Sequence, residues 1–218
     1  MSLAIFDLDN TLLGGDSDYL WGQFLVEQGL VDGEHYESEN QRFYEAYEAG
    51  TLDIYQYQAF MLRPLAGRPL TELQAWRERF MEEKIQPILL PRADELLNQR
   101  RLAGDILLII TATNRFITAP IAERFGVPHL LATEPEIIDG RYTGRTVGIP
   151  CFQKGKVERL DAWLAETGGD LTDSWFYSDS HNDLPLLNRV THPVAVDPDA
   201  TLARHAQERG WPIISLRN

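Results

Sequence analysis

The sequence predicts an α/β fold, in which an open, mostly parallel, Rossmann-like sheet carries helices on both faces and a helical-bundle cap is inserted after the first strand. Residues 3–6 and 106–110 are uninterrupted apolar runs, which is typical of strands that are buried on both faces. Four amphipathic helical patterns lie between these runs, and helix and strand patterns alternate in the rest of the chain. We therefore expect a core domain of residues 1–14 plus 87–218 and a cap domain of residues 15–86.

The expected cap consists of four consecutive helices. Asp16 or Ser17 can cap the first of them, and Thr71 with Gln74 matches the capping-box pattern that opens the fourth. The four predicted helices are residues 17–29, 34–49, 53–63 and 71–86. The aromatic residues expected in the bundle core are Trp21, Phe43, Tyr57 and Trp76.

The expected core domain alternates helices and strands. Asp139 and Gly140 lie between apolar and aromatic residues, which is typical of a hairpin turn. The predicted helices are residues 91–103, 120–125, 154–165 and 200–208, and the predicted strands are residues 3–6, 106–110, 129–132, 174–177, 194–196 and 213–216. Right-handed crossovers between parallel strands place such helices on both faces of the sheet.

The composition is that of a globular protein with an acidic balance. Hydrophobic residues make up 44% of the 218 residues, and the formal net charge is −13. Nucleic acids and anionic membranes need a basic surface, so we expect neither as a partner. A small phosphorylated metabolite is compatible with this charge, because local cations and a bound metal can reverse the sign within one site. No pattern in the sequence indicates an oligomeric state.

Cysteine usage and hydropathy favour a cytoplasmic protein. Cys151 is the only cysteine, so an intramolecular disulfide is impossible and the thiol is expected to be inert. The first residues lack the basic region of a signal peptide and reach an aspartate at position 7. No apolar stretch approaches the roughly 18 residues that a membrane-spanning helix needs.

Polar side chains follow three of the predicted strands at the point where each strand ends. Asp7 and Asp9 follow the first strand, Thr111 the second and Asp179 a later one. Because the carboxyl ends of parallel strands meet at one edge of the sheet, we expect these side chains to converge there. Lys156, at the start of a predicted helix, adds a cation. Phosphoryl transfer needs this set: a nucleophile, ligands for a metal such as Mg²⁺, and donors for phosphate oxygens.

Each of these signals has a plainer interpretation when it is taken alone. Asp9 or Asn10 could cap a turn after the strand, Thr111 could cap a helix, and Lys156 could be a solvated helical lysine. A receiver-type signalling domain also gathers acidic residues, a threonine and a lysine around a phosphoaspartate. Such a domain has no helical bundle after its first strand, so the joint pattern favours an enzyme.

The order and spacing of these residues resemble those of a known enzyme superfamily. Residues 7–11 (Asp-Leu-Asp-Asn-Thr) are similar to the D-x-D-x-T signature of the haloacid dehalogenase-like superfamily of phosphatases. Thr111 and Lys156 resemble its second and third motifs, and residues 179–183 resemble its acidic fourth motif, although Ser178 stands where many members have glycine. The inserted helices resemble the cap of the phosphoserine phosphatase-like subfamily, a group that includes histidinol-phosphate phosphatases.

The resemblance implies a role for each matching residue. Asp7 would be the nucleophile that forms an aspartyl-phosphate, and Asp9 would be first the general acid and then the general base. Thr111 and Lys156 would bind phosphate oxygens. The implied ligands of Mg²⁺ are Asp7, the backbone carbonyl of Asp9, Asp179 and, through a metal-bound water, Asp183.

The resemblance also implies a substrate class, an amino-alcohol phosphate, with histidinol phosphate first and phosphoserine second. Asp16 matches an acidic cap position that meets the substrate ammonium in phosphoserine phosphatases, and it could equally be a helix cap. Asn182 matches an asparagine of the fourth motif and is expected near the phosphate. His181, Arg115 and Arg63 are weaker candidates for substrate contact. A phosphotransferase of the same superfamily, which passes the phosphoryl group to an alcohol instead of water, is an open alternative.

Overall fold

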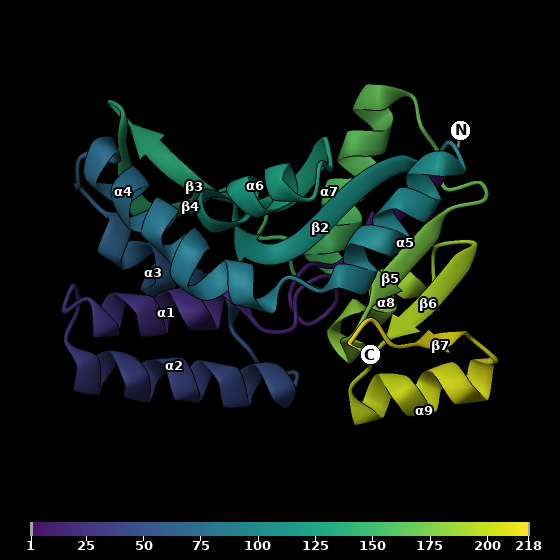
Figure 1. The fold of residues 1–218 in the computed structure, drawn as a ribbon, viewed down its shortest axis with the longest axis horizontal. Coiled ribbons are helices and arrows are strands. Elements are labelled where there is room, and N and C mark those ends of the chain that lie inside the picture. Colours follow the sequence, from purple (N-terminus) through teal and green to yellow (C-terminus); the bar gives the residue numbers. More distant parts are fainter. Residues whose placement is uncertain (1, 218) are drawn as a thin grey trace.

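A seven-stranded sheet runs through the molecule (Figure 1). The structure, a computed structural model, describes residues 2–217 of the chain. The strands are β1 Leu3–Phe6, β2 Ile106–Asn114, β3 His129–Ile138, β4 Arg141–Val147, β5 Trp175–Ser178, β6 His192–Val196 and β7 Ile213–Ile214. They lie in the order β4-β3-β2-β1-β5-β6-β7, and every neighbouring pair is parallel except β3 and β4. The predicted open, mostly parallel sheet is confirmed.

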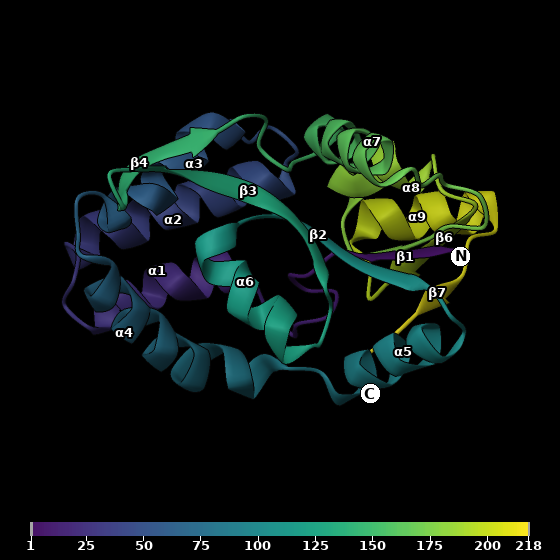
Figure 2. The same cartoon turned by 90° about the horizontal axis from the view of Figure 1, so that it is seen from above.

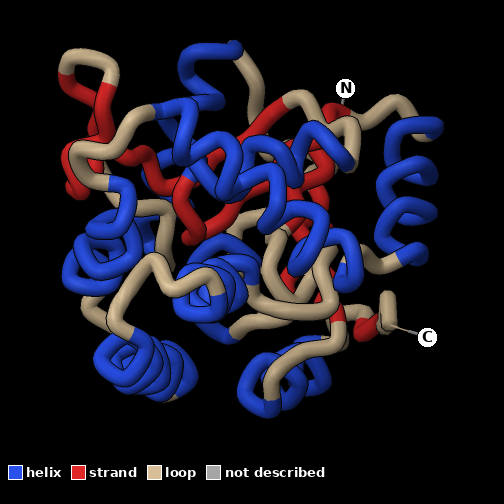
Figure 3. Tube along the Cα trace, turned by 60° about the vertical axis from the view of Figure 1, so that its left-hand side comes forward, coloured by secondary structure: helices blue, strands red, loops and turns tan. Residues whose placement is uncertain are grey.

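Helices cover both faces of this sheet (Figure 2). The core helices are α5 Pro91–Leu102, α6 Arg115–Arg124, α7 Lys154–Thr167, α8 Leu184–Leu187 and α9 Ala200–Arg209. Side chains alternate along β1, so Ala4 and Phe6 pack with α5 and α6, whereas Leu3 and Ile5 pack with α7, α8 and α9. None of these four residues is more than 3% exposed. Burial on both faces explains the uninterrupted apolar sequence of β1, and Figure 3 shows helices on either side of the central strands.

Four helices between β1 and β2 form the insertion that the sequence predicts as a cap. They are α1 Ser17–Glu27, α2 Gly33–Glu48, α3 Ile54–Leu62 and α4 Leu70–Phe80, followed by a π-helical turn at Met81–Ile85. Figure 1 shows these helices together at one end of the molecule. Trp21, Phe24 and Phe80 are fully buried there, with ring centroids 5.1 to 5.8 Å apart. The insertion therefore has an aromatic core, and its boundaries as a separate domain stay a prediction.

The strands β3 and β4 extend into a hairpin that contacts this insertion. Asp139 and Gly140 have φ angles of 49° and 72°, the left-handed values of a two-residue hairpin turn, so the predicted turn is confirmed. The amide of Gly67, which follows α3, donates to the carbonyl of Tyr142 at 2.9 Å, and Arg141 donates to the carbonyl of Gly67 at 2.6 Å. β3 is longer than predicted because its second half pairs with β4 across this turn.

The predicted capping box at the start of α4 is wrong. α4 begins at Leu70, its N-cap is Pro69, and no side chain caps it. Pro69 has φ −61° and ψ 137°, an extended backbone that ends the preceding turn. The proline sets the boundary one residue before Thr71, so Thr71 and Gln74 lie inside the helix.

α6 begins at Arg115, five residues before the predicted start at Pro120. A proline inside a helix leaves the carbonyl four residues earlier without its helical donor. That carbonyl belongs to Phe116, and the guanidinium of Arg77, from α4, donates to it at 3.0 Å. The helix tolerates Pro120 because another element supplies the missing hydrogen bond.

The other helix and strand boundaries differ from the predicted ones by a few residues. β2 continues past residue 110 to Asn114, so Thr111 lies within the strand and not after it. No helix in the described part of the chain is long and apolar enough to cross a membrane.

Candidate active site

Asp7, Thr111 and Asp179 meet at the carboxyl ends of three neighbouring strands. Asp7 directly follows β1, Asp179 directly follows β5, and Thr111 lies near the end of β2. β1 lies between β2 and β5, and the chain builds the sheet outward from β1 first on one side and then on the other. Open α/β sheets bind ligands at such a switch point.

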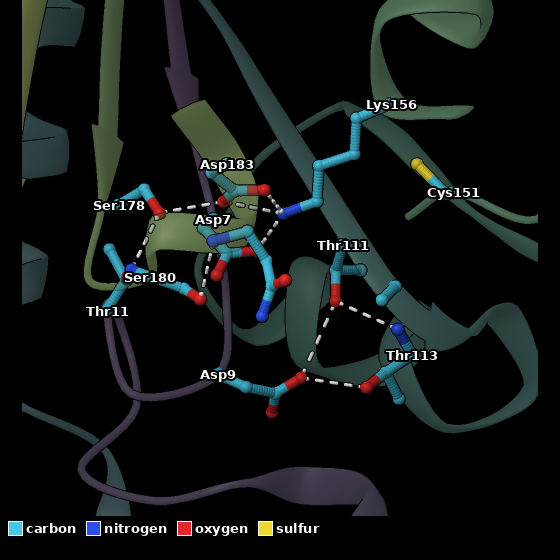
Figure 4. Close-up of polar contacts among 12 residues, drawn as sticks. Asp7, Asp9, Thr11, Thr111, Thr113, Cys151, Lys156, Ser178, Ser180 and Asp183 are labelled. Carbon is cyan, nitrogen blue, oxygen red and sulfur yellow. Dashed lines mark hydrogen bonds and ion pairs between the residues drawn. The ribbon is translucent and has the colours of Figure 1, made fainter. Parts of the chain in front are cut away.

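Lys156 joins two carboxylates of this site. Its Nζ lies 2.8 Å from a carboxylate oxygen of Asp7 and 2.8 Å from one of Asp183 (Figure 4), and all three side chains are buried. Burial raises the pKa of Asp7 to about 7, although the charge of Lys156 acts to lower it. Burial also acts to lower the pKa of Lys156, but the charges of Asp183 and Asp7 raise that pKa overall. The lysine therefore stays an ammonium ion.

The start of α7 explains how Lys156 reaches this position. Gln153, directly before the helix, has a φ angle of 48°. A Cβ atom on Gly155 would lie 2.1 Å from the carbonyl oxygen of Pro150, so only glycine allows this close approach. The tight turn places the next side chain, that of Lys156, in the site.

Asp9 is held by groups from α1 and β2. One of its carboxylate oxygens accepts the amide of Ser17 at 2.7 Å, and the other accepts the hydroxyl of Thr113 at 2.8 Å. The Thr111 hydroxyl lies 3.5 Å from that second oxygen and accepts the amide of Thr113 at 3.2 Å. Burial, followed by the charge of Asp16, raises the pKa of Asp9 to about 6.

Sequence analysis does not identify Thr113, because it ends the strand at Ile110. Side chains two residues apart in a strand share a face. The spacing of Thr111 and Thr113 would therefore have pointed to a second hydroxyl in the site, had the strand been extended. Figure 4 shows both hydroxyl groups directed at Asp9.

Hydroxyl groups also hold Asp179 and Asp183. Thr11 Oγ1 donates to the carboxylate of Asp179 at 2.9 Å and accepts the amide of the same residue at 3.1 Å. Ser178 Oγ donates to the carboxylate of Asp183 at 2.7 Å and accepts the amide of Ser180 at 3.2 Å. Ser178, which departs from the glycine of the family pattern, thus orients Asp183 in this chain.

The oxygen atoms of Asp7, Asp9 and Asp179 are donors that fit a divalent cation. Burial, with the charge of Asp7 next, raises the pKa of Asp179 well above its ordinary range. Within residues 2–217, Lys156 is the one cation paired with Asp7 or Asp183, and no cation pairs with Asp179. No group of three or more His, Cys, Asp or Glu side chains in this range is gathered to hold a metal. The expected Mg²⁺ site needs only two carboxylates in direct contact, those of Asp7 and Asp179, together with the backbone carbonyl of Asp9. These oxygen donors suit Mg²⁺.

A cavity leads from these residues toward α1, α2 and α3. Asp7, Asp9, Thr111 and Lys156 line its core side, and Asp16 and Asp18 line the side formed by the insertion. The aromatic residues that line it are Tyr19, Phe43, Tyr44, Tyr47, Tyr57 and Phe152. Phe43 and Tyr57, expected in the bundle core, therefore face ligand space as well.

Asp16 caps a helix, as expected, and it also lines the cavity; its contact with a substrate ammonium stays a prediction. Its carboxylate caps α1 by accepting the amide of Tyr19 at 2.9 Å. Its side chain also lines the cavity, and burial raises its pKa. Helix capping and a place in the cavity are thus combined in one carboxylate.

Asn182 lines the cavity, but its amide also connects two parts of the protein. Its oxygen accepts the side-chain amide of Gln153 at 2.8 Å, and its nitrogen donates to the carbonyl of Tyr47 at 3.2 Å. This contact joins the fourth motif to α2 and holds the insertion over the site. A contact between Asn182 and phosphate stays a prediction.

His181, Arg115 and Arg63 are absent from the described lining of this cavity. His181 Nδ1 lies 2.8 Å from a carboxylate oxygen of Asp199. Arg115 pairs with Glu134 at 2.8 Å. Substrate contact by these three residues therefore has no support from their positions.

The single cysteine is not part of the polar network. Cys151 is fully buried near Lys156 (Figure 4), and its thiol donates to the carbonyl of Leu131 at 3.5 Å. Burial raises the pKa of this thiol to about 12. It stays a neutral thiol, in agreement with the inert role expected from the sequence.

Comparison with known proteins gives consistent similarities over the whole chain. A curated relative from Neisseria meningitidis serogroup C (strain 8013), named histidinol-phosphatase, is 46% identical over 220 residues, which cover 99% of each chain. Phosphoserine phosphatase SerB1 of Mycobacterium tuberculosis (strain ATCC 25618 / H37Rv) is 33% identical over 98% of this chain and 70% of its own length.

Solved structures share the fold. A protein of unknown function from Bordetella pertussis Tohama I is 48% identical and superposes with a TM-score of 0.93 over 99% of this chain and 98% of its own. A phosphoserine phosphatase with an analogue of the phospho-aspartyl intermediate has a TM-score of 0.72 over 100% of this chain and 94% of its own; at 18% identity it supports the fold alone. The family pattern of the haloacid dehalogenase-like hydrolases matches residues 4–188. The chain belongs to the haloacid dehalogenase-like hydrolase family and, within it, to the phosphatases.

Proposed function

We propose that this chain is a Mg²⁺-dependent phosphomonoester hydrolase that acts through an aspartyl-phosphate on a small amino-alcohol phosphate such as histidinol phosphate. The observation that carries the proposal is the contrast between Asp7 and Asp9. Asp7 is buried and paired with the ammonium of Lys156, whereas Asp9 is half-buried and held by an amide and a hydroxyl. Two carboxylates in such different environments can divide the roles of nucleophile and acid/base catalyst.

In the first step, Asp7 attacks the phosphorus atom. A bond forms between a carboxylate oxygen of Asp7 and phosphorus, and the bond between phosphorus and the ester oxygen breaks. Asp9 gives its proton to the departing alkoxide, and its raised pKa of about 6 keeps part of the population protonated near neutral pH. Thr111 and Lys156 bind phosphate oxygens, and the ammonium screens the nucleophile from the anionic substrate.

In the second step, water releases the phosphate. Asp9, now ionised, takes a proton from a water molecule whose oxygen attacks phosphorus. The bond between Asp7 and phosphorus breaks, which restores the Asp7 carboxylate and produces inorganic phosphate. The insertion over the cavity limits access by other water molecules.

The cofactor of the proposal is Mg²⁺. Asp7, the backbone carbonyl of Asp9 and Asp179 would hold it, and Asp183 would complete the site. When bound, the cation neutralises charge on the phosphate oxygens and on the buried carboxylates.

The cavity favours an organic cation over a second anionic group on the substrate. Lys156 is the one lysine or arginine in its described lining, and it is already paired with two carboxylates. A phosphoserine carboxylate would therefore find no cation, because Arg63 is not part of that lining. A substrate ammonium would meet Asp16. Histidinol phosphate before phosphoserine also agrees with the name of the 46% identical relative.

The test is phosphate release from a panel of phosphorylated metabolites, measured with Mg²⁺ and with EDTA. We expect the highest kcat/KM for histidinol phosphate and no turnover in EDTA. Higher kcat/KM for sugar phosphates would contradict the substrate, and turnover that EDTA leaves unchanged would contradict the cofactor. Adding alcohol acceptors tests the alternative, because a phosphotransferase would form a new phosphate ester and little free phosphate.

A further inference from the structure

The cavity combines two sides of opposite charge. The core side offers Lys156 and Thr111, where the phosphate binds in the proposed reaction. The insertion side offers Asp16 and Asp18, and no lysine, arginine or histidine of residues 2–217 forms an ion pair with either. A cationic group of a ligand would therefore meet two carboxyl groups here that no cation of these residues already pairs with.

Asp18 is more deeply buried than a carboxylate without a cation should be. Its exposure is 2%. One oxygen accepts the side-chain amide of Asn114 at a long 3.3 Å. Burial, followed by the charges of Asp16 and Asp9, raises the pKa of Asp18 well above its ordinary range. Burying this carboxyl group in its ionised form is unfavourable unless a cation is supplied.

Helix capping does not account for Asp18, although it lies in the first turn of α1. Asp16 already caps that helix. Two other aspartates of the insertion, Asp32 and Asp53, cap α2 and α3, and both are exposed to solvent. Asp18 instead lies in the cavity wall, which indicates a role toward the ligand.

Aromatic rings flank this part of the cavity. The rings of Phe43 and Tyr57, which line the cavity, meet edge to face with centroids 5.3 Å apart. Tyr57 and Thr113 both act on the Asp18 carboxyl group and lower its pKa against the effect of burial. Flat apolar walls beside a carboxylate suit a flat ring that carries N–H donors or positive charge.

We propose that Asp18 is a specificity-determining residue that binds a nitrogen heterocycle of the substrate, while Asp16 binds its ammonium. The inference rests on the proposed phosphatase function and deepens it. The substrate class is then a phosphate monoester that carries both a primary ammonium and a ring with N–H donors. Asp18 contributes to recognition of the ring and takes no part in the bond-making steps.

The experiment compares three substrates in three proteins. Histidinol phosphate carries the ammonium and the ring, O-phosphoethanolamine carries the ammonium alone, and p-nitrophenyl phosphate carries no cation. The proteins are the wild type, Asp18→Asn and the matched control Asp32→Asn. We expect Asp18→Asn to lower the ratio of kcat/KM between histidinol phosphate and O-phosphoethanolamine at least tenfold, chiefly through KM. Asp32→Asn should keep the wild-type ratio.

The outcomes separate this inference from the proposed function. An equal loss on all three substrates would make Asp18 a structural residue, and an unchanged ratio would remove it from the ligand site. If thermal unfolding shows that Asp18→Asn is not folded, Asp18→Glu replaces it in the experiment. This variant keeps the charge, displaces it by one methylene and should lower the ratio of kcat/KM between histidinol phosphate and O-phosphoethanolamine. A wild type that cleaves p-nitrophenyl phosphate but prefers O-phosphoethanolamine overturns the inference alone. A wild type that cleaves none of the three overturns the proposed function as well.

Discussion

Asp7 and Lys156 form a buried ion pair in which each residue controls the charge of the other. Burial favours neutral forms of both groups, yet the ammonium lies 2.8 Å from the carboxylate. The charge of Lys156 lowers the pKa of Asp7 against the larger rise that burial causes, so the pKa ends at about 7 and not higher. The same ammonium also donates to a carboxylate oxygen of Asp183, so Asp7 is positioned by a network and not by a single contact.

The variant Asp7→Asn tests the nucleophile. Asparagine keeps the size of the side chain but cannot form an acyl phosphate, so we expect kcat to fall by at least about a thousandfold, or roughly 4 kcal/mol of lost transition-state stabilisation. Phosphate release and thermal unfolding measure the two consequences, and the fold should be retained. The matched control is Asp161→Asn, an exposed aspartate paired with Arg189. Activity of Asp7→Asn within tenfold of wild type would exclude Asp7 as the nucleophile.

The variant Asp9→Asn tests the acid/base role. We expect slow turnover of alkyl phosphates, because their leaving group needs a proton, and a smaller effect on the first step with p-nitrophenyl phosphate, whose leaving group does not. The phosphoenzyme should then accumulate, since water attack also needs Asp9. Rapid quench should show a burst of nitrophenol close to the enzyme concentration. Equal losses on both substrate types without a burst would place the acid/base role elsewhere.

Among the helices, α6 shows how one element can repair a defect of another. Pro120 leaves the carbonyl of Phe116 without its helical donor, and Arg77 of α4 supplies a hydrogen bond at 3.0 Å. A buried carbonyl without a partner costs about 1–3 kcal/mol. The contact therefore couples the insertion to the core through the stability of α6.

A double-mutant cycle measures this coupling. Arg77→Met should lower the free energy of unfolding by about 1–3 kcal/mol. In the background of Pro120→Ala, the new amide can bond to Phe116, so the same change should cost markedly less. Denaturant unfolding of the four proteins gives the interaction energy, and equal costs of Arg77→Met in both backgrounds would show that the guanidinium stabilises the protein in another way, such as by its packing over the Phe116 ring.

The same elements explain which parts of the structure the sequence could predict. Strand ends and their polar residues were predictable because β1 is buried on both faces and has a uniform apolar pattern that stops at Asp7. The start of α6 was not predictable, because Arg77, the donor that compensates for Pro120, lies 39 residues before Phe116 in the chain. The place of Thr113 in the site depends on the length of β2, and the inward direction of the Asp18 side chain depends on the packing of α1. Both are set by tertiary contacts that local periodicity does not contain.

For the whole molecule, the dominant electrostatic feature is an excess of buried acid. The chain has a formal net charge of −13, and Asp7, Asp9, Asp16, Asp18 and Asp179 all have raised pKa values for which burial is the largest cause. Such groups oppose folding when they are ionised. The protein thus gives up part of its stability to hold a site that attracts cations.

This excess of acid predicts that the metal-free protein loses stability as the pH rises from 5 to 8. The pKa of Asp7 rises from its ordinary value of 3.8 to about 7, and that of Asp9 from 3.8 to about 6. Between these values the folded state binds more protons than the unfolded state, so stability is highest below the window and falls as the pH passes the folded pKa. Each kcal/mol lost should lower Tm by roughly 2–4 °C for a chain of this size.

Thermal unfolding in EDTA and in Mg²⁺ between pH 5 and 8 checks the sign and its cause. In EDTA, Tm should fall with rising pH, and Asp7→Asn should make the slope shallower because it removes one of the titrating groups. Mg²⁺ binds the folded state and should raise Tm most at pH 8, where the carboxylates are ionised. A Tm in EDTA that climbs from pH 5 to 8, or a Mg²⁺ effect that is largest at pH 5, would show that the buried carboxylates are already compensated within the protein.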